Sequence, residues 1–85
     1  MEPSKVIVYG TNWCPDCWRA KKILEARHVA YQWVNIDEDV QAAAYVKHLN
    51  GGMRSVPTLV FTDGTILVEP SNAMLLQELA SRLKP

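Results

Sequence analysis

The two cysteines of the chain, Cys14 and Cys17, lie three positions apart in the stretch WCPDCW. Two thiols at this spacing can bind a metal ion, form a structural disulfide or act as a reversible redox pair. A permanent disulfide is uncommon inside cells, where thiols are kept reduced. The chemistry of this chain therefore depends on which role the two sulfurs take.

A zinc site would need ligands beyond the two cysteines. A Cys2His2 site requires two histidines a few residues apart, whereas His28 and His48 fall on different predicted helices. We expect both histidines on solvated faces or helix ends. We therefore predict no structural metal site, and redox chemistry is favoured.

The composition limits the classes of partner. The chain has 85 residues, 48% of them hydrophobic and 21% charged, which is typical of one globular domain over residues 1–85. Nine basic residues balance nine acidic residues, so we expect no basic surface for nucleic acid or an anionic membrane. The apolar run Val6–Tyr9 is too short for a signal peptide or a membrane span. We expect a cytoplasmic monomer.

A strand, a helix and a second strand are predicted around the cysteines. Val6–Tyr9, closed by Gly10, is typical of a strand buried on both faces. After a loop, Pro15 suits the first position of a helix that ends near His28. The apolar positions of this helix recur at spacings of three and four: Cys17, Ala20, Ile23 and Leu24. Tyr31–Ile36 is expected to form the next strand.

A second helix is predicted after this strand. Asp37 can cap its start, and Gly51 and Gly52 can end it. Its expected apolar side consists of Val40, Ala43, Ala44 and Leu49.

A hairpin and a closing helix complete the order β-α-β-α-β-β-α. Thr58–Phe61 and Ile66–Val68 are strand-like runs separated by Asp63-Gly64, a signal for a tight turn. Ser71 can cap the last helix, whose apolar stripe is Leu75, Leu76, Leu79 and Leu83. Because crossover connections are right-handed, the first two strands are expected to be parallel in a mixed four-stranded sheet with three helices on its faces.

The predicted helix start gives the two cysteines different roles. Cys14 would occupy the N-cap, where free N–H groups and the helix dipole stabilise a thiolate. Cys17 would lie one turn deeper, more buried but close enough to attack a mixed disulfide on Cys14. We therefore predict that Cys14 is the nucleophile and Cys17 the resolving cysteine. Pro15 fixes the first helical dihedral, and Asp16 is expected to oppose the thiolate through like-charge repulsion.

This order, with its C-x-x-C motif at the first helix, resembles the thioredoxin fold and specifically its glutaredoxin branch. The resemblance covers nearly the whole chain and rests on VIVYG leading into WCPDC, on SVPT, on the hairpin around DGT and on the closing helix. Within the branch, NGGMRSVPT followed by TDGTILVEPS looks most like the mycoredoxins. These are glutaredoxin-like proteins that work with mycothiol in place of glutathione.

The resemblance implies a substrate-binding set around Cys14. It implies that the Val56-Pro57 bond is cis and faces Cys14, although a proline here could also simply begin an edge strand. In the family, the main chain of the residue before this proline pairs with an extended thiol substrate, which would be the role of Val56. Trp13 and Pro15 lie beside Cys14 in this set. Trp13 and Trp18 can each serve either packing or contact with a disulfide-bearing partner.

The chain departs from the pattern of glutathione-using members at two places. Where they carry a basic residue before the first cysteine and paired aspartates before the last helix, this chain reads TNW and VEPSNA. Ser71 and Asn72 could contact a polar or sugar-bearing thiol, while Ser71 could equally act only as a helix cap.

The residues and the resemblance together predict a thiol–disulfide oxidoreductase without a bound cofactor. It would reduce mixed disulfides between proteins and a low-molecular-weight thiol, mycothiol or else glutathione. One alternative is a reductant of protein disulfides, such as that of ribonucleotide reductase, supplied by the flavoprotein thioredoxin reductase. Another is an iron–sulfur protein like some glutaredoxins, which hold a cluster between two subunits with external thiols as further ligands.

Overall fold

The strands and helices follow the predicted order. The computed structural model describes residues 5–82. Its elements are β1 (Lys5–Gly10), α1 (Pro15–Ala26), β2 (Ala30–Asn35), α2 (Val40–Leu49), β3 (Thr58–Phe61), β4 (Ile66–Val68) and α3 (Asn72–Arg82). The prediction of a mixed four-stranded sheet with three helices is confirmed.

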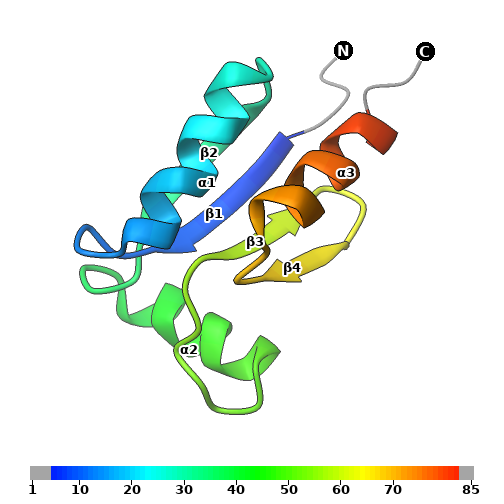
Figure 1. Ribbon diagram of the computed structural model, residues 1–85. Helices are drawn as coiled ribbons and strands as arrows, with labels where there is room; N and C mark the ends of the chain where they lie inside the picture. The colour runs from blue at the N-terminus through cyan, green and yellow to red at the C-terminus, as the bar shows by residue number, and fades with distance from the viewer. Residues whose placement is uncertain (1–4, 83–85) are drawn as a thin grey trace.

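The sheet has the strand order β2-β1-β3-β4. β1 pairs in parallel with β2, whereas β3 is antiparallel to both β1 and β4. Figure 1 shows α1 and α3 side by side in front of the sheet, and α2 beyond the end of β1 at which α1 begins. The C-terminal end of β1, the start of α1 and α2 therefore meet at one end of the molecule.

One hydrophobic core fills the space between the sheet and the pair α1 and α3. Because side chains of a strand alternate between faces, every second residue of β1 and β3 points into this core. The residues of the core are Val6, Val8, Ala20, Leu24, Val29, Leu59, Phe61, Leu75 and Leu79. On the other face of β1, Ile7 and Tyr9 are only half-buried, so the prediction of a strand buried on both faces is wrong for that second face.

The second helix begins two residues later than a cap at Asp37 would place it. The side chain of Asp39 is the N-cap and accepts the N–H of Ala42 at 2.9 Å. Val46 is the fully buried residue of α2, and Val40 is 86% exposed. Of the predicted apolar side, Ala43 and Leu49 are half-buried, whereas Val40 and Ala44 are exposed. The prediction is therefore right for two of its four residues.

The remaining predicted boundaries agree closely with the structure. The second strand starts and ends one residue earlier than expected, and Leu75, Leu76 and Leu79 of the closing helix are buried or half-buried. Leu83, predicted for the same stripe, lies outside the described residues. No helix among residues 5–82 combines the length and apolar character needed to cross a bilayer.

Candidate active site at the start of α1

Cys14 occupies the N-cap of α1, as predicted. Its backbone is extended, with φ −94° and ψ 109°, and Pro15 is the first helical residue. The Cys14 sulfur accepts a hydrogen bond from the N–H of Cys17 at 3.0 Å. This contact satisfies one of the free N–H groups of the first turn, and the helix dipole favours negative charge on the same sulfur. Cys14 remains slightly exposed, at 8%.

Cys17 lies beneath Cys14 and is 1% exposed. Burial, followed by the hydrogen bond and the charge of Cys14, raises the pKa of the Cys17 thiol to about 12, while the backbone of Thr11 acts in the opposite direction. The space around Cys17 depends on Gly10. A Cβ at that position would lie 2.6 Å from the Cys17 sulfur and 2.7 Å from the Trp33 ring, closer than such atoms can approach.

The loop before β3 brings Val56 against Cys14. The Val56-Pro57 bond is cis, as the family resemblance implied. The Cys14 sulfur lies 4.0 Å from the Val56 carbonyl oxygen, to which it can donate as a thiol. The buried hydroxyl of Thr58 donates to the Ser55 carbonyl at 2.7 Å. This hydrogen bond holds the loop against the start of β3.

Two aspartates neutralise arginines next to this site. Asp16, in the first turn of α1, forms an ion pair with Arg19. Asp37 accepts a hydrogen bond from Arg54 at 2.7 Å and another from the indole of Trp13 at 3.0 Å. The Arg54 contact, together with the indole, lowers the pKa of the Asp37 carboxyl.

We predicted from the sequence that Asp37 caps the second helix, and we predicted no role for Arg54. Asp37 instead connects the loop before Cys14 with the loop before Val56. Its partners are 24 and 17 residues away in the chain, so no local pattern could have indicated the contact.

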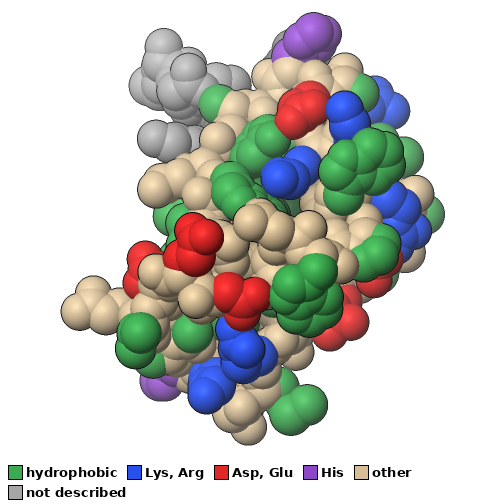
Figure 2. Space-filling view, turned by 90° about the vertical axis from the view of Figure 1, so that its left-hand side faces the viewer, with side chains coloured by type: hydrophobic (Ala, Val, Ile, Leu, Met, Phe, Trp, Pro, Cys, Tyr) green, Lys and Arg blue, Asp and Glu red, His purple; other side chains and the backbone are tan. Residues whose placement is uncertain are grey.

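The two tryptophans that flank the cysteines are exposed. Trp13 is 70% and Trp18 is 59% exposed, so neither serves mainly as packing. Figure 2 shows this face of the molecule, on which exposed hydrophobic side chains lie among both positive and negative groups.

Ser71 and Asn72 lie at the start of α3. The Ser71 hydroxyl accepts the N–H of Met74 at 3.1 Å, so its predicted role as a helix cap is confirmed. The segment before it is joined to the Pro57 loop, because the N–H of Glu69 donates to the Pro57 carbonyl at 2.8 Å. Within the described chain, neither Ser71 nor Asn72 forms a hydrogen bond to Cys14 or Val56.

Both predicted solvated histidines, His28 and His48, are exposed. Among residues 5–82, no three or more His, Cys, Asp or Glu side chains form a group that could hold a metal ion.

Comparison with known proteins assigns the chain to a family. The family model described as Glutaredoxin matches residues 6–67. A Mycobacterium tuberculosis protein bearing the name "Putative glutaredoxin Rv3198A" is 42% identical over 84% of each chain. Mycoredoxin 1 of Corynebacterium glutamicum is 36% identical over 89% of this chain and 94% of its own.

Solved structures show the same fold. The glutaredoxin of Archaeoglobus fulgidus superimposes with a TM-score of 0.69 and 30% identity, covering 88% of this chain and 84% of its own. The thioredoxin-like protein BC3987 gives a TM-score of 0.70 with 26% identity, covering 92% and 99%. The fold is thus thioredoxin-like, and the chain belongs to the glutaredoxin family.

Proposed function

We propose that this protein reduces mixed disulfides between proteins and mycothiol. Members of the glutaredoxin family are thiol–disulfide oxidoreductases that use a low-molecular-weight thiol, and the likeness to Mycoredoxin 1 supports mycothiol as that thiol. The observation that carries the proposal is the position of the Cys14 sulfur. It meets the N-terminus of a helix on one side and the Val56 carbonyl on the other.

In the first step, the Cys14 thiolate attacks the mycothiol sulfur of the mixed disulfide. A new S–S bond joins Cys14 to mycothiol, the original S–S bond breaks, and the client protein leaves as a thiolate that takes a proton from water. The N–H of Cys17 and the dipole of α1 stabilise the attacking thiolate.

The second step can follow two routes. A second mycothiol can attack the mycothiol sulfur, which releases mycothiol disulfide and restores Cys14. Alternatively, the Cys17 thiolate attacks the Cys14 sulfur, which releases mycothiol and leaves a Cys14–Cys17 disulfide. Because the charge of Cys14 contributes to the raised pKa of Cys17, that contribution disappears once Cys14 is bound to mycothiol.

The surrounding residues would hold the substrate. The main chain of Val56 would pair with the extended thiol, and the Trp13 indole and Pro15 would line the approach to Cys14. Ser71 and Asn72 offer polar groups at the start of α3, the element joined to the Pro57 loop through Glu69. We infer a cytoplasmic setting, in which the thiols stay reduced between turnovers.

Turnover of a mycothiolated model peptide tests the proposal. Mycothiol, glutathione and thioredoxin reductase are supplied separately as the source of electrons, with Cys14→Ser as the blank. We expect turnover with mycothiol, and little with either of the others. Equal turnover with glutathione would refute the mycothiol assignment, and turnover only with thioredoxin reductase would support a protein-disulfide reductant instead.

A further inference from the structure

The two arginines nearest to the candidate site are both already paired with a carboxylate. Arg19 lies one turn along α1 from Asp16, with which it forms an ion pair. Arg54 donates to Asp37 at 2.7 Å. Each member of these pairs is between about a third and a half exposed, so both pairs lie at the surface.

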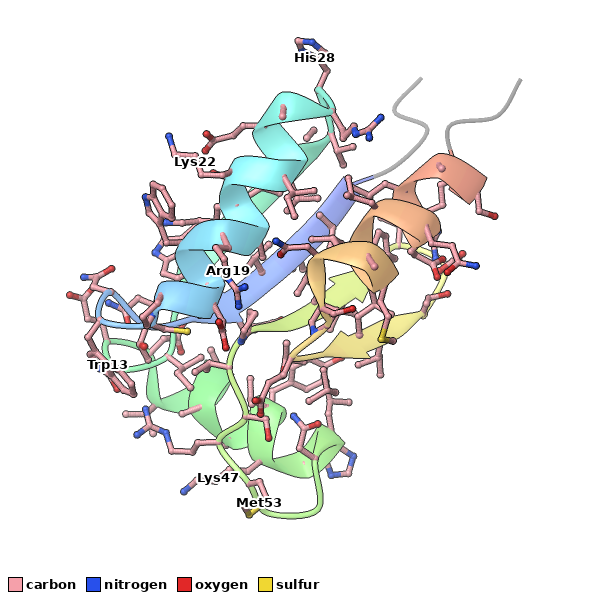
Figure 3. All side chains as sticks on the ribbon, viewed as in Figure 1. Trp13, Arg19, Lys22, His28, Lys47 and Met53 are labelled. Carbon is pink, nitrogen blue, oxygen red and sulfur yellow. The ribbon has the colours of Figure 1, made fainter. Side chains whose placement is uncertain are left out.

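One member of each pair lies two residues in the sequence from a residue that would meet the substrate. Asp16 follows Cys14 by two positions, and Arg54 precedes Val56 by two positions. Asp37 also holds the Trp13 indole at 3.0 Å, directly before Cys14. Figure 3 shows Arg19 pointing back toward the start of α1 and Trp13 at the edge of that same end. Lys47 lies on α2, away from the start of α1 (Figure 3).

Pairing changes what an arginine can bind. A guanidinium next to a carboxylate carries little net charge as a pair, but it keeps N–H donors that the carboxylate does not use. The carboxylate in turn keeps acceptor positions. Such a pair suits hydroxyl groups, which donate and accept. An incoming carboxylate gains little from the compensated guanidinium and approaches the negative charge of the aspartate.

We propose that Asp16 and Asp37 are specificity residues that exclude thiols bearing carboxylates and leave the site suited to an uncharged, hydroxyl-rich thiol. This inference rests on the proposed function and names the basis of its selectivity. Glutathione carries carboxylates at both ends, whereas mycothiol is a thiol built on sugar and cyclitol rings without a carboxylate. Because Arg19 and Arg54 already form ion pairs with the two aspartates, they are not free to pair with the carboxylates of glutathione.

The first test uses the unmodified protein and changes only the substrate. Model peptides are linked to glutathione or to glutathione diethyl ester, in which both carboxylates are masked, and kcat/KM is measured for each. We expect the ester to react about two- to fivefold faster than glutathione, the range that surface charge pairs contribute, with a smaller difference at high salt. Equal rates, or faster reaction of glutathione, would overturn the inference.

The second test releases the arginines. Asp16→Asn and Asp37→Asn keep the shape and the acceptor oxygen of each side chain but remove its charge. Each should raise kcat/KM for the glutathione peptide relative to the mycothiol peptide by about two- to fivefold, and the double variant by more. Because both substrates react at the same Cys14 sulfur, a change in the reactivity of that sulfur cancels in the ratio.

Glu78→Gln is the matched control. It also removes one negative charge from an ion pair with an arginine, Arg82, but on the later part of α3. The ratio should stay at its starting value in this variant. An equal rise in the control would mean that net charge alone sets the preference, and an unchanged ratio in both Asp variants would refute the role of the aspartates.

The outcomes separate this inference from the proposed function. If the unmodified protein does not turn over the mycothiol peptide, the proposed function fails, while the ester comparison still decides whether the site repels carboxylates. If the protein prefers mycothiol but neither Asp variant changes the ratio, the proposed function stands and the inference fails.

Discussion

Cys17 lies one turn of α1 beneath Cys14, where burial is the main reason that the pKa of its thiol is raised to about 12. A thiol with such a pKa is protonated at neutral pH, and a protonated thiol is a poor nucleophile. Under the proposed mechanism, burial would keep Cys17 from competing with Cys14 for substrate. The two sulfurs of one motif can thus perform different steps.

The raised pKa of Cys17 predicts how release of the small thiol depends on pH. The attack of Cys17 on the Cys14 adduct needs the thiolate, whose fraction grows by about tenfold per pH unit below its pKa. We expect the single-turnover release of mycothiol from the Cys14 adduct to accelerate steadily from pH 6 to 9. Rapid-quench mass spectrometry measures this step, and Cys17→Ser, which lacks it, gives the background. A rate that is flat across this range would show that Cys17 is already ionised in the adduct.

At the scale of single residues, the features that could be predicted from the sequence are those set by a residue's position within one helix or strand. Cys14 at the N-cap and Cys17 one turn deeper follow from the local pattern of Pro15 and the apolar spacing. The contact of Asp37 with Trp13 and Arg54 could not be predicted, because it joins three loops that only the folded sheet brings together.

At the scale of elements, α1 ends in an unusual way. His28 has φ 59°, the left-handed conformation that favours glycine. The N–H of His28 donates to the Glu25 carbonyl and the N–H of Val29 to the Leu24 carbonyl, at 3.1 and 2.9 Å. This paired closure directs Val29 into the core beside Leu24, where β2 then begins. The end of α1 at this point therefore depends on a residue, His28, with a strained backbone conformation.

Replacing His28 with glycine is expected to give a more stable protein. His28→Gly should raise the free energy of unfolding by about 0.5–1 kcal/mol, because glycine adopts the left-handed conformation without a Cβ penalty, partly offset by its greater freedom when unfolded. Urea denaturation measures the change. Arg27→Gly is the control, because Arg27 has φ −94° and gains nothing from glycine. A loss of stability in His28→Gly would show that the imidazole makes a contribution larger than the strain.

The errors in α2 have a physical cause at the same scale. Asp37 and Asp39 are both acceptable caps by residue type, and the choice depends on tertiary contacts, because Asp37 is occupied by Arg54 and Trp13. Within the helix that results, Val46 is buried, whereas Val40 and Ala44 are exposed.

At the scale of the whole molecule, Arg82 joins the hairpin to the last helix. Its guanidinium contacts Asp63 of the β3–β4 turn at 2.9 Å and Glu78 of α3 at 3.0 Å, and it lies 4.0 Å from the centre of the Phe61 ring. The hydrogen bonds from Arg82, together with those from Thr65, hold the pKa of the Asp63 carboxyl well below its usual range. The β3–β4 turn and the end of α3, which this cluster joins, lie at the end of the molecule away from the start of α1 (Figure 1).

The lowered pKa of Asp63 predicts an acid-dependent loss of stability. A carboxyl whose pKa is lower in the folded state stabilises the fold above its unfolded pKa of about 4, and this contribution is lost as the pH falls toward the folded pKa. We therefore expect Asp63→Asn to be less stable than the unmodified protein at pH 7, with a difference that shrinks at pH 3. Thermal unfolding at both values measures it. A stability difference that is the same at both pH values would show that the substitution acts through something other than the ionisation of Asp63.

The central claim is that Cys14 takes the small thiol and releases the client protein. Without free thiol, Cys17→Ser stops the reaction after this first step, because neither a second mycothiol nor Cys17 is present to resolve the adduct. The decisive measurement is the intact mass of Cys17→Ser after reaction with a mycothiolated protein in the absence of free thiol. We predict a species heavier by one mycothiol, lost on reduction and absent in the Cys14→Ser/Cys17→Ser double variant. A Cys14 adduct with the client protein, or no adduct at all, would contradict the account.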